Sequence, residues 1–99
     1  MINVVAIITA QPGKRSELLK VFTAILPQVH AETGCIEYQP VVDSDVPGSQ
    51  AKLGSDTYMV IEKWDRMQDL RAHASSDHMQ EYAKISGHLV AERKVYILS

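Results

Sequence analysis

Positive charge, cysteine and long apolar runs are all scarce in this sequence. Ten Lys and Arg stand against twelve Asp and Glu, for a net charge of -2. A nucleic-acid-binding surface needs clustered positive charge, so we expect no nucleic-acid partner. No apolar run approaches the roughly 18 residues of a transmembrane helix, so we expect no membrane association. The single Cys35 cannot form an internal disulfide, and no signal-peptide pattern follows Met1. Together these features predict a cytoplasmic protein.

The common cofactor and metal motifs are missing as well. The sequence holds no GxGxxG, P-loop, CxxC or HExxH motif, and we therefore expect neither a bound cofactor nor a metal. His73 and His78 come nearest to a ligand pair, but they are five residues apart, whereas a pair on one helix is expected at i,i+4 spacing. No obvious carboxylate or cysteine completes the set. Cys35 has no adjacent cationic residue and is expected to be a small buried thiol.

What the sequence does contain is the pattern of one small α+β domain spanning residues 1–99. Its 99 residues are 45% hydrophobic, which is a globular balance. Alternating and β-branched runs predict strands, and apolar residues at helical spacing predict helices. Strands are expected over 2–10, 35–43, 57–64 and 89–98, and helices over 14–32, 66–74 and from Ser75 or Ser76 to Gly87. This β-α-β-β-α-β order, with the second helix broken in two, predicts a ferredoxin-like, four-stranded antiparallel sheet.

Local signals set the expected ends of the helices. Asp65 resembles an N-cap of the second helix, with Gln68 placed three residues later in a capping-box arrangement. Pro27 falls inside the first helical pattern and is expected to kink or loosen its last turns. Gly34 is the expected C-terminal stop of that helix. The polar, irregular stretch 43–56 predicts a long loop.

The first strand is apolar on both of its faces. A sheet with one wet face would show a clean alternation of apolar and polar residues, and this strand does not. Since helices cover only one face of a ferredoxin-like sheet, the other face is expected to pack against a second copy of the chain. We therefore expect a homodimer. The two faces of the strand are Ile2, Val4, Ala6 and Ile8, and Asn3, Val5, Ile7 and Thr9.

A set of aromatic and histidine side chains is expected to converge between the sheet and the helices. His73 follows Leu70 by three residues, on the side of its helix that should meet the sheet. An apolar slot with a few polar tips is what a flat aromatic ligand needs, although Trp and Tyr at such positions are also common in a plain core. The charges of Glu62, Lys63, Asp65 and Arg66 are expected to be solvated. The converging candidates are Tyr38, Tyr58, Trp64, His73 and Tyr82.

Two stretches of the sequence resemble a known family. They are Gly34-Cys35-Ile36-Glu37-Tyr38 and Glu62-Lys63-Trp64, the second followed after five residues by Leu70-Arg71-Ala72-His73-Ala74-Ser75-Ser76-Asp77-His78-Met79. On these motifs the chain resembles the antibiotic biosynthesis monooxygenase family, whose fold is a dimeric α+β barrel. Within that family it looks most like the small bacterial quinol monooxygenases. The likeness extends over nearly the whole chain.

The resemblance implies a cofactor-independent monooxygenase that oxidises a quinol or a related polycyclic phenol with O2. In that chemistry the substrate supplies the electrons, and the protein binds a flat aromatic, promotes its deprotonation and excludes water. Val60 stands where polyketide-oxidising members have an Asn, and Leu70 where they have a Tyr. Asn3 lies near the terminus and does not match the pocket Asn of the haem-degrading members.

Each candidate side chain receives an expected role from this chemistry. His73 is the expected base that deprotonates a phenolic hydroxyl, because imidazole titrates near neutral pH. Trp64 and Tyr58 are the expected apolar walls of the pocket. His78, Tyr82 and Tyr38 are expected to bind or orient the substrate, although His78 alone would more often be a surface or capping residue.

Two other functions stay open at this point. One is an isomerase of a small phosphorylated signal molecule, since a branch of the same fold carries out that reaction. It would need an anion site, for which the sequence offers only the scattered cations Lys52, Lys84 and Arg93. The other is a non-catalytic barrel that sequesters a hydrophobic metabolite, because a fold does not determine a function.

Overall fold

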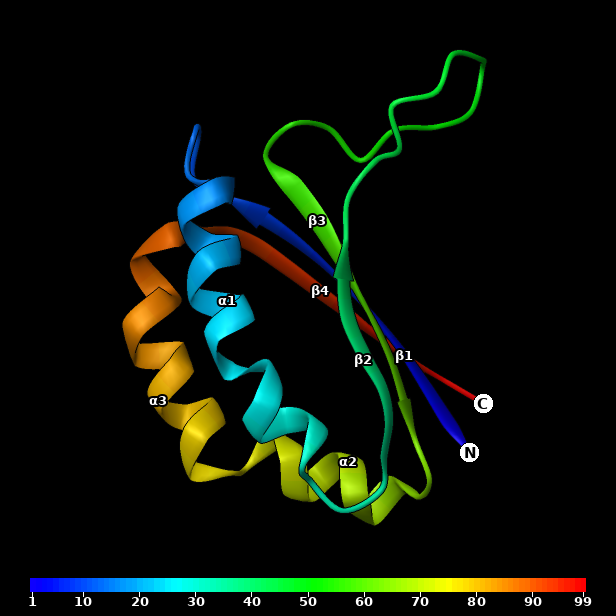
Figure 1. Cartoon of the computed structure of the whole chain (residues 1–99), viewed down its shortest axis with the longest axis vertical. Helices are drawn as coiled ribbons and strands as arrows, with labels where there is room; N and C mark the ends of the chain where they lie inside the picture. Colours follow the sequence, from blue (N-terminus) through cyan, green and yellow to red (C-terminus); the bar gives the residue numbers. More distant parts are fainter.

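The computed structural model describes all 99 residues and confirms the ferredoxin-like order of elements. Four strands form one sheet, and three helices lie together on one side of it (Figure 1). The helices therefore form one layer and the sheet the other. The elements are β1 (Ile2–Ala10), α1 (Arg15–His30), β2 (Cys35–Val41), β3 (Thr57–Trp64), α2 (Met67–Ala74), α3 (Asp77–Ser86) and β4 (Val90–Leu98), with a 3-10 turn at Gly87–Leu89.

The sheet has the strand order β2-β3-β1-β4, and every neighbouring pair is antiparallel. The first strand is thus a central one, which agrees with its apolar residues on both faces. Val4 pairs with Glu62 of β3 and Ile97 of β4. Since side chains at paired positions share a face, this register places Glu62 and Ile97 on the face that the helices cover.

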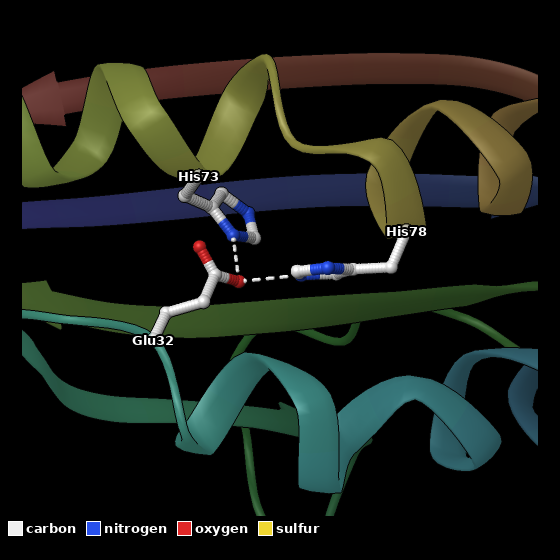
Figure 2. A group of neighbouring side chains, drawn as sticks. All are labelled: Glu32, His73 and His78. Carbon is white, nitrogen blue, oxygen red and sulfur yellow. Dashed lines mark hydrogen bonds and ion pairs between the residues drawn. The ribbon is translucent and has the colours of Figure 1, made fainter.

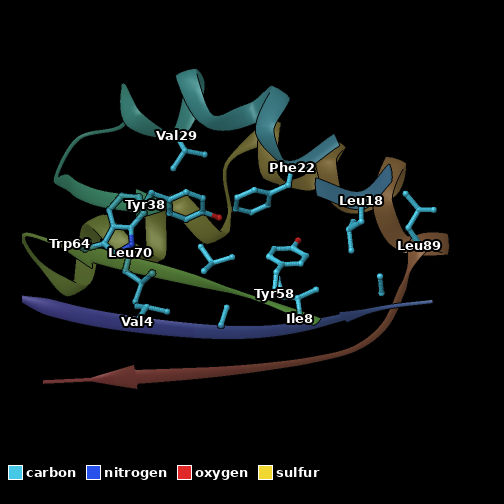
Figure 3. Close-up of a cluster of buried hydrophobic side chains, with 13 residues drawn as sticks. Val4, Ile8, Leu18, Phe22, Val29, Tyr38, Tyr58, Trp64, Leu70 and Leu89 are labelled. Atoms are coloured by element: carbon cyan, nitrogen blue, oxygen red, sulfur yellow. The ribbon is translucent and has the colours of Figure 1, made fainter. Parts of the chain in front are cut away.

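The core fills the space between α1 and the β3 side of the sheet (Figure 3). Leu18, Phe22 and Val29 recur at helical spacing on α1 and are its fully buried residues. The Phe22 ring stacks on Tyr38 with centroids 5.7 Å apart and meets Tyr58 edge-on at the same separation. These aromatic contacts fix α1 over β2 and β3.

The structure confirms one of the predicted helix ends and corrects others. Arg66, and not Asp65, is the N-cap of α2, and no side chain caps this helix end. The Asp65 backbone N–H donates to the carbonyl of Gly34 at 2.8 Å, which holds Asp65 to the turn before β2 and delays the helix. The prediction of Ser76 as N-cap of α3 is confirmed, because its Oγ accepts from the Met79 N–H. The first helix runs through the exposed Pro27 and ends at His30, with Ala31 as its C-cap, so the prediction of Gly34 as its stop is wrong.

The outer face of the sheet carries no helix. Its centre is apolar, because Val5 pairs with Ile61 of β3 and with Tyr96 of β4. Tyr96 is 48% exposed. No helix in the structure is both long and apolar enough to cross a bilayer.

The long loop after β2 projects beyond the sheet (Figure 1). The Asp43 carboxylate ties its two ends together by accepting from the N–H groups of Leu53 and Gly54 at 2.8 and 2.9 Å. The loop thus has a defined base, formed by one side chain.

Candidate active site

A cavity of about 690 Å³ lies between the inner face of the sheet and helices α2 and α3. Its size is in the range of small-molecule sites, and most of its lining residues are hydrophobic. The cavity exists because side chains of the helices cover the inner face of β3 but leave the inner face of β4 uncovered. Val95 of β4 remains 44% exposed and Ile97 55% exposed. Polar groups enter this apolar space from Glu62, His73, Arg93, Tyr38 and Tyr82.

His73 lies in the last turn of α2 and is 5% exposed. Its Nδ1 is 2.9 Å from Oε2 of Glu32. A carboxylate can only accept, so Nδ1 carries the hydrogen, and the neutral ring has an unprotonated Nε2. The Nε2 atom has no hydrogen-bond partner within the protein, and the residue lines the cavity. This arrangement presents a proton acceptor to whatever occupies the cavity.

Glu32 joins two histidines through a single oxygen (Figure 2). It lies in the turn after α1, whereas His73 lies in the last turn of α2 and His78 in the first turn of α3. Its Oε2 is also 2.8 Å from Nε2 of His78, which lies 3.3 Å from the Ser76 hydroxyl. Glu32 is 41 residues from His73 in sequence, so no local motif could have identified it.

The same three side chains are of the types that bind zinc or iron, and their ligand atoms lie within 4.8 Å of one another. The sequence predicted no metal because no nearby carboxylate completed the pair of histidines, and Glu32 supplies that carboxylate through the fold. Here its Oε2 serves as the shared hydrogen-bond acceptor of both rings. The three side chains therefore supply a ligand set for a metal, and the same Glu32 oxygen is also placed to fix the His73 ring by its hydrogen bond.

Glu62 corrects a prediction, since it was expected in solvent and is only 7% exposed. It shares the inner face of β3 with Tyr58, Val60 and Trp64. Its Oε1 accepts a hydrogen bond of 3.0 Å from Nε1 of Trp64. Burial raises the pKa of the Glu62 carboxyl, while the Trp64 hydrogen bond and the nearby His73 and Arg93 oppose that rise.

The aromatic candidates divide into two groups. Tyr38 and Tyr82 line the cavity as expected. Trp64 and Tyr58, the expected walls, are both 0% exposed and lie behind the lining. The reason is that α1 covers Tyr58 through Phe22, while His73 covers Trp64 with a ring centroid 4.8 Å away. His78 also lies outside the cavity lining and is held by Glu32.

The three scattered cations do not gather into an anion site. Arg93 lines the cavity from β4, two residues before Val95, so the alternation of the strand could have placed it there. Lys52 donates to the carbonyls of Ser44 and Val46 within the long loop. Lys84 is exposed on α3 and is absent from the cavity lining. Only one cation of the three is therefore available to a ligand.

Residues 1–85 match the family model described as antibiotic biosynthesis monooxygenase. The chain is 34% identical to the "Probable quinol monooxygenase YgiN" of Escherichia coli K12, over 99% of this chain and 96% of that protein. Among solved structures, PA3566 from Pseudomonas aeruginosa superposes with a TM-score of 0.82 at 25% identity, over 98% of this chain and 90% of that one. Rv0793 from Mycobacterium tuberculosis superposes at 0.81 and 23% identity, over 99% and 92%, a likeness of fold alone.

Proposed function

This chain belongs to the antibiotic biosynthesis monooxygenase family, and we propose that it oxidises a quinol or related polycyclic phenol with O2 and without a cofactor. The family match and the similarity to a protein named as a quinol monooxygenase support a monooxygenase-type function. The observation that carries the finer proposal is His73, whose Nδ1 is held by Glu32 and whose Nε2 is free beside an apolar cavity. A flat phenol in that cavity would meet a positioned base.

The reaction begins with a proton transfer. Nε2 of His73 takes the proton of one phenolic hydroxyl, and the Glu32 carboxylate stabilises the imidazolium that forms. The quinolate passes one electron to O2, and the resulting semiquinone and superoxide radicals couple to form a carbon–oxygen bond. The peroxide then loses its distal oxygen as water. Overall, one quinol and one O2 give one hydroxyquinone and one water.

The remaining lining would bind and orient the ring. The apolar side chains of β1, β4 and α2 exclude water from the charged intermediates. Tyr38 and Tyr82 offer hydroxyl groups at the cavity wall. Burial raises the pKa of Tyr38, so this hydroxyl stays protonated and can donate a hydrogen bond to a phenolate oxygen. Trp64 and Tyr58 would act from behind the lining, by fixing His73 and the core.

We also propose that the active form is a homodimer. The outer face of the sheet presents Val5, Ile61 and Tyr96 at its centre, and the structure leaves it uncovered by helices. A second copy placed face to face would bury this patch through an isologous contact. The cavity lies on the opposite face of each sheet, so each protomer would keep its own site.

Oxygen uptake tests the proposed activity directly. The protein, freed of metal by a chelator, is mixed with menadiol in air, and uptake is compared with the uncatalysed rate. His73→Ala should lower the catalysed rate by about 10² or more, the usual share of a general base. His88→Ala, in the exposed 3-10 turn, is the matched control and should keep the wild-type rate. A loss below about threefold in His73→Ala would remove His73 from the mechanism, and quinone binding without uptake would favour the sequestering barrel.

A further inference from the structure

The proposed reaction requires two proton transfers of opposite sense. A base must take a proton from the phenol before the electron moves, and an acid must give a proton to the distal oxygen as the O–O bond breaks. One imidazole would have to perform both tasks at different positions on the bound intermediate. A second titratable group in the same cavity could perform the later one.

Glu62 is such a group. It lies in the cavity lining, and its side chain is almost entirely removed from solvent. One oxygen, Oε1, is held by the Trp64 indole at 3.0 Å. The other oxygen, Oε2, makes no hydrogen bond with the protein and is not sealed in the core as the Tyr58 hydroxyl is. The carboxyl is therefore fixed at one end and available at the other.

Trp64 holds Glu62 and His73 on one support. The indole N–H binds the Glu62 carboxyl, and the indole ring lies 4.8 Å from the His73 ring, tilted by 39°. Because both side chains contact the same rigid group and face the same cavity, a bicyclic aromatic bound there would lie within reach of both. The two groups also differ in type, one an imidazole with a free nitrogen and the other a carboxyl in an apolar wall.

We propose that Glu62 is the catalytic acid that protonates the departing oxygen of the peroxide, while His73 is the base that starts the reaction. This assignment rests on the proposed quinol oxidation. The His73 imidazolium first returns its proton to the distal oxygen, which makes the peroxide a hydroperoxide. The O–O bond then breaks while the ring carbon loses its hydrogen: the electron pair of the C–H bond forms the new C=O bond, and the distal oxygen leaves as water with the Glu62 proton. The proton from the ring carbon restores the Glu62 carboxyl.

The surroundings of Glu62 raise the pKa of its carboxyl above the usual value. Burial raises its pKa, and Glu32 acts in the same direction. The groups that oppose the rise are the Trp64 N–H, His73 and Arg93. Arg93 comes from β4 on the far side of the cavity, where it can balance the negative charge left after proton transfer.

Glu62→Gln separates the two proton transfers. Glutamine keeps the shape and can still accept from Trp64, but it has no proton to give. Since His73 is intact, the variant should still take up O2, whereas loss of a general acid slows O–O cleavage by about 10². The peroxide should then decay by expelling its whole O2 unit, which converts quinol and O2 into quinone and H2O2. We expect H2O2 to rise from under about a tenth to over about half of the O2 consumed.

The readout is H2O2 per O2, measured with a peroxidase assay beside the oxygen electrode. Glu81 is exposed on α3, and Glu81→Gln is the control. It should remain coupled, meaning that it releases as little H2O2 per O2 consumed as the wild type. Glu62→Asp, which retains an acid set back by one methylene, should be partly coupled. Quenching of Trp64 fluorescence by a bound quinone checks that each variant is folded and binds.

Each outcome decides the assignment. An H2O2 yield in Glu62→Gln equal to that of a coupled wild type would overturn the role of Glu62 and leave the proposed function standing. A wild type that consumes no O2 above background would overturn the proposed function, and the assignment with it. A wild type that already releases all consumed O2 as H2O2 would also overturn the assignment, because no O–O bond is then broken.

Discussion

Replacing Glu32 with glutamine tests the link between the fold and the proposed base. Glu32 does not line the cavity, so it acts on the reaction through the groups that it binds and through its charge, which also raises the pKa of Glu62. Its Oε2 accepts from His73 at 2.9 Å and from His78 at 2.8 Å. The Glu32→Gln side chain would retain one acceptor oxygen and lose the negative charge. The His73 ring would then lose both its fixed tautomer and the partner of its charged form.

The expected size of the effect follows from the strength of one bond. A hydrogen bond to a charged group contributes about 1.5–3 kcal/mol, and each 1.36 kcal/mol of activation free energy is about a factor of ten in rate. Glu32→Gln should therefore slow quinol-dependent O2 uptake by about 10- to 150-fold. This places the variant between the wild type and His73→Ala. Glu32→Asp, which keeps the charge, should recover part of the loss.

A double-mutant cycle shows whether Glu32 acts through His73. If it does, adding Glu32→Gln to His73→Ala should cost little further rate, because the group that Glu32 positions is already gone. His78→Gln is the matched control, since it removes the other partner of the same oxygen and should change the rate by less than about threefold. Urea unfolding checks that all variants are folded. Equal losses from Glu32→Gln with and without His73 would refute the positioning role.

Three further predictions concern the stability and assembly of the protein. Gly34→Ala should lower the free energy of unfolding by about 2 kcal/mol or more, because φ is +80° and an added Cβ would collide with buried Asp69. Gly13 has a similar φ of +76° but no neighbouring atom, so Gly13→Ala should lower the free energy of unfolding clearly less. Equal losses of the two variants in urea unfolding would contradict this. Ile61→Glu should convert the dimer to a monomer in light scattering, and a monomeric wild type would exclude the proposed interface. Because burial raises the Glu62 pKa, wild type should lose stability relative to Glu62→Gln as the pH rises from about 4.3 through that pKa; a difference independent of pH would contradict this sign.

The sequence allowed the fold to be predicted because its signals are local. Helical spacing on α1 and alternation on β3 predicted which faces are buried, and the structure agrees at both elements. The same alternation placed Glu62 beside Trp64 on the inner face, yet its charge suggested solvent. The cost of burying a carboxyl is offset here by the indole hydrogen bond, which a residue pattern does not reveal.

The site was harder to predict because it depends on contacts between distant segments. Alternation puts Tyr58 and Trp64 on the inner face, but it does not tell whether a helix covers them. Phe22 of α1 covers Tyr58, and His73 of α2 covers Trp64, so both lie behind the cavity wall. Glu32 was missed for the same reason, since its connection to His73 exists only once the turn after α1 meets α2.

That meeting point depends on Gly34. Its carbonyl accepts from the Asp65 N–H at 2.8 Å, and its missing Cβ leaves room for the Asp69 side chain. Asp69 is one helical turn before His73, and Glu32 is two residues before Gly34. The close approach that requires a glycine therefore also sets the distance between the carboxylate and the imidazole. In a Gly34→Ala protein that still folds, the Glu32 carboxylate and the His73 imidazole should lie farther apart, and quinol oxidation should fall as much as in Glu32→Gln. The same glycine would then determine both the stability of this junction and the position of the proposed base.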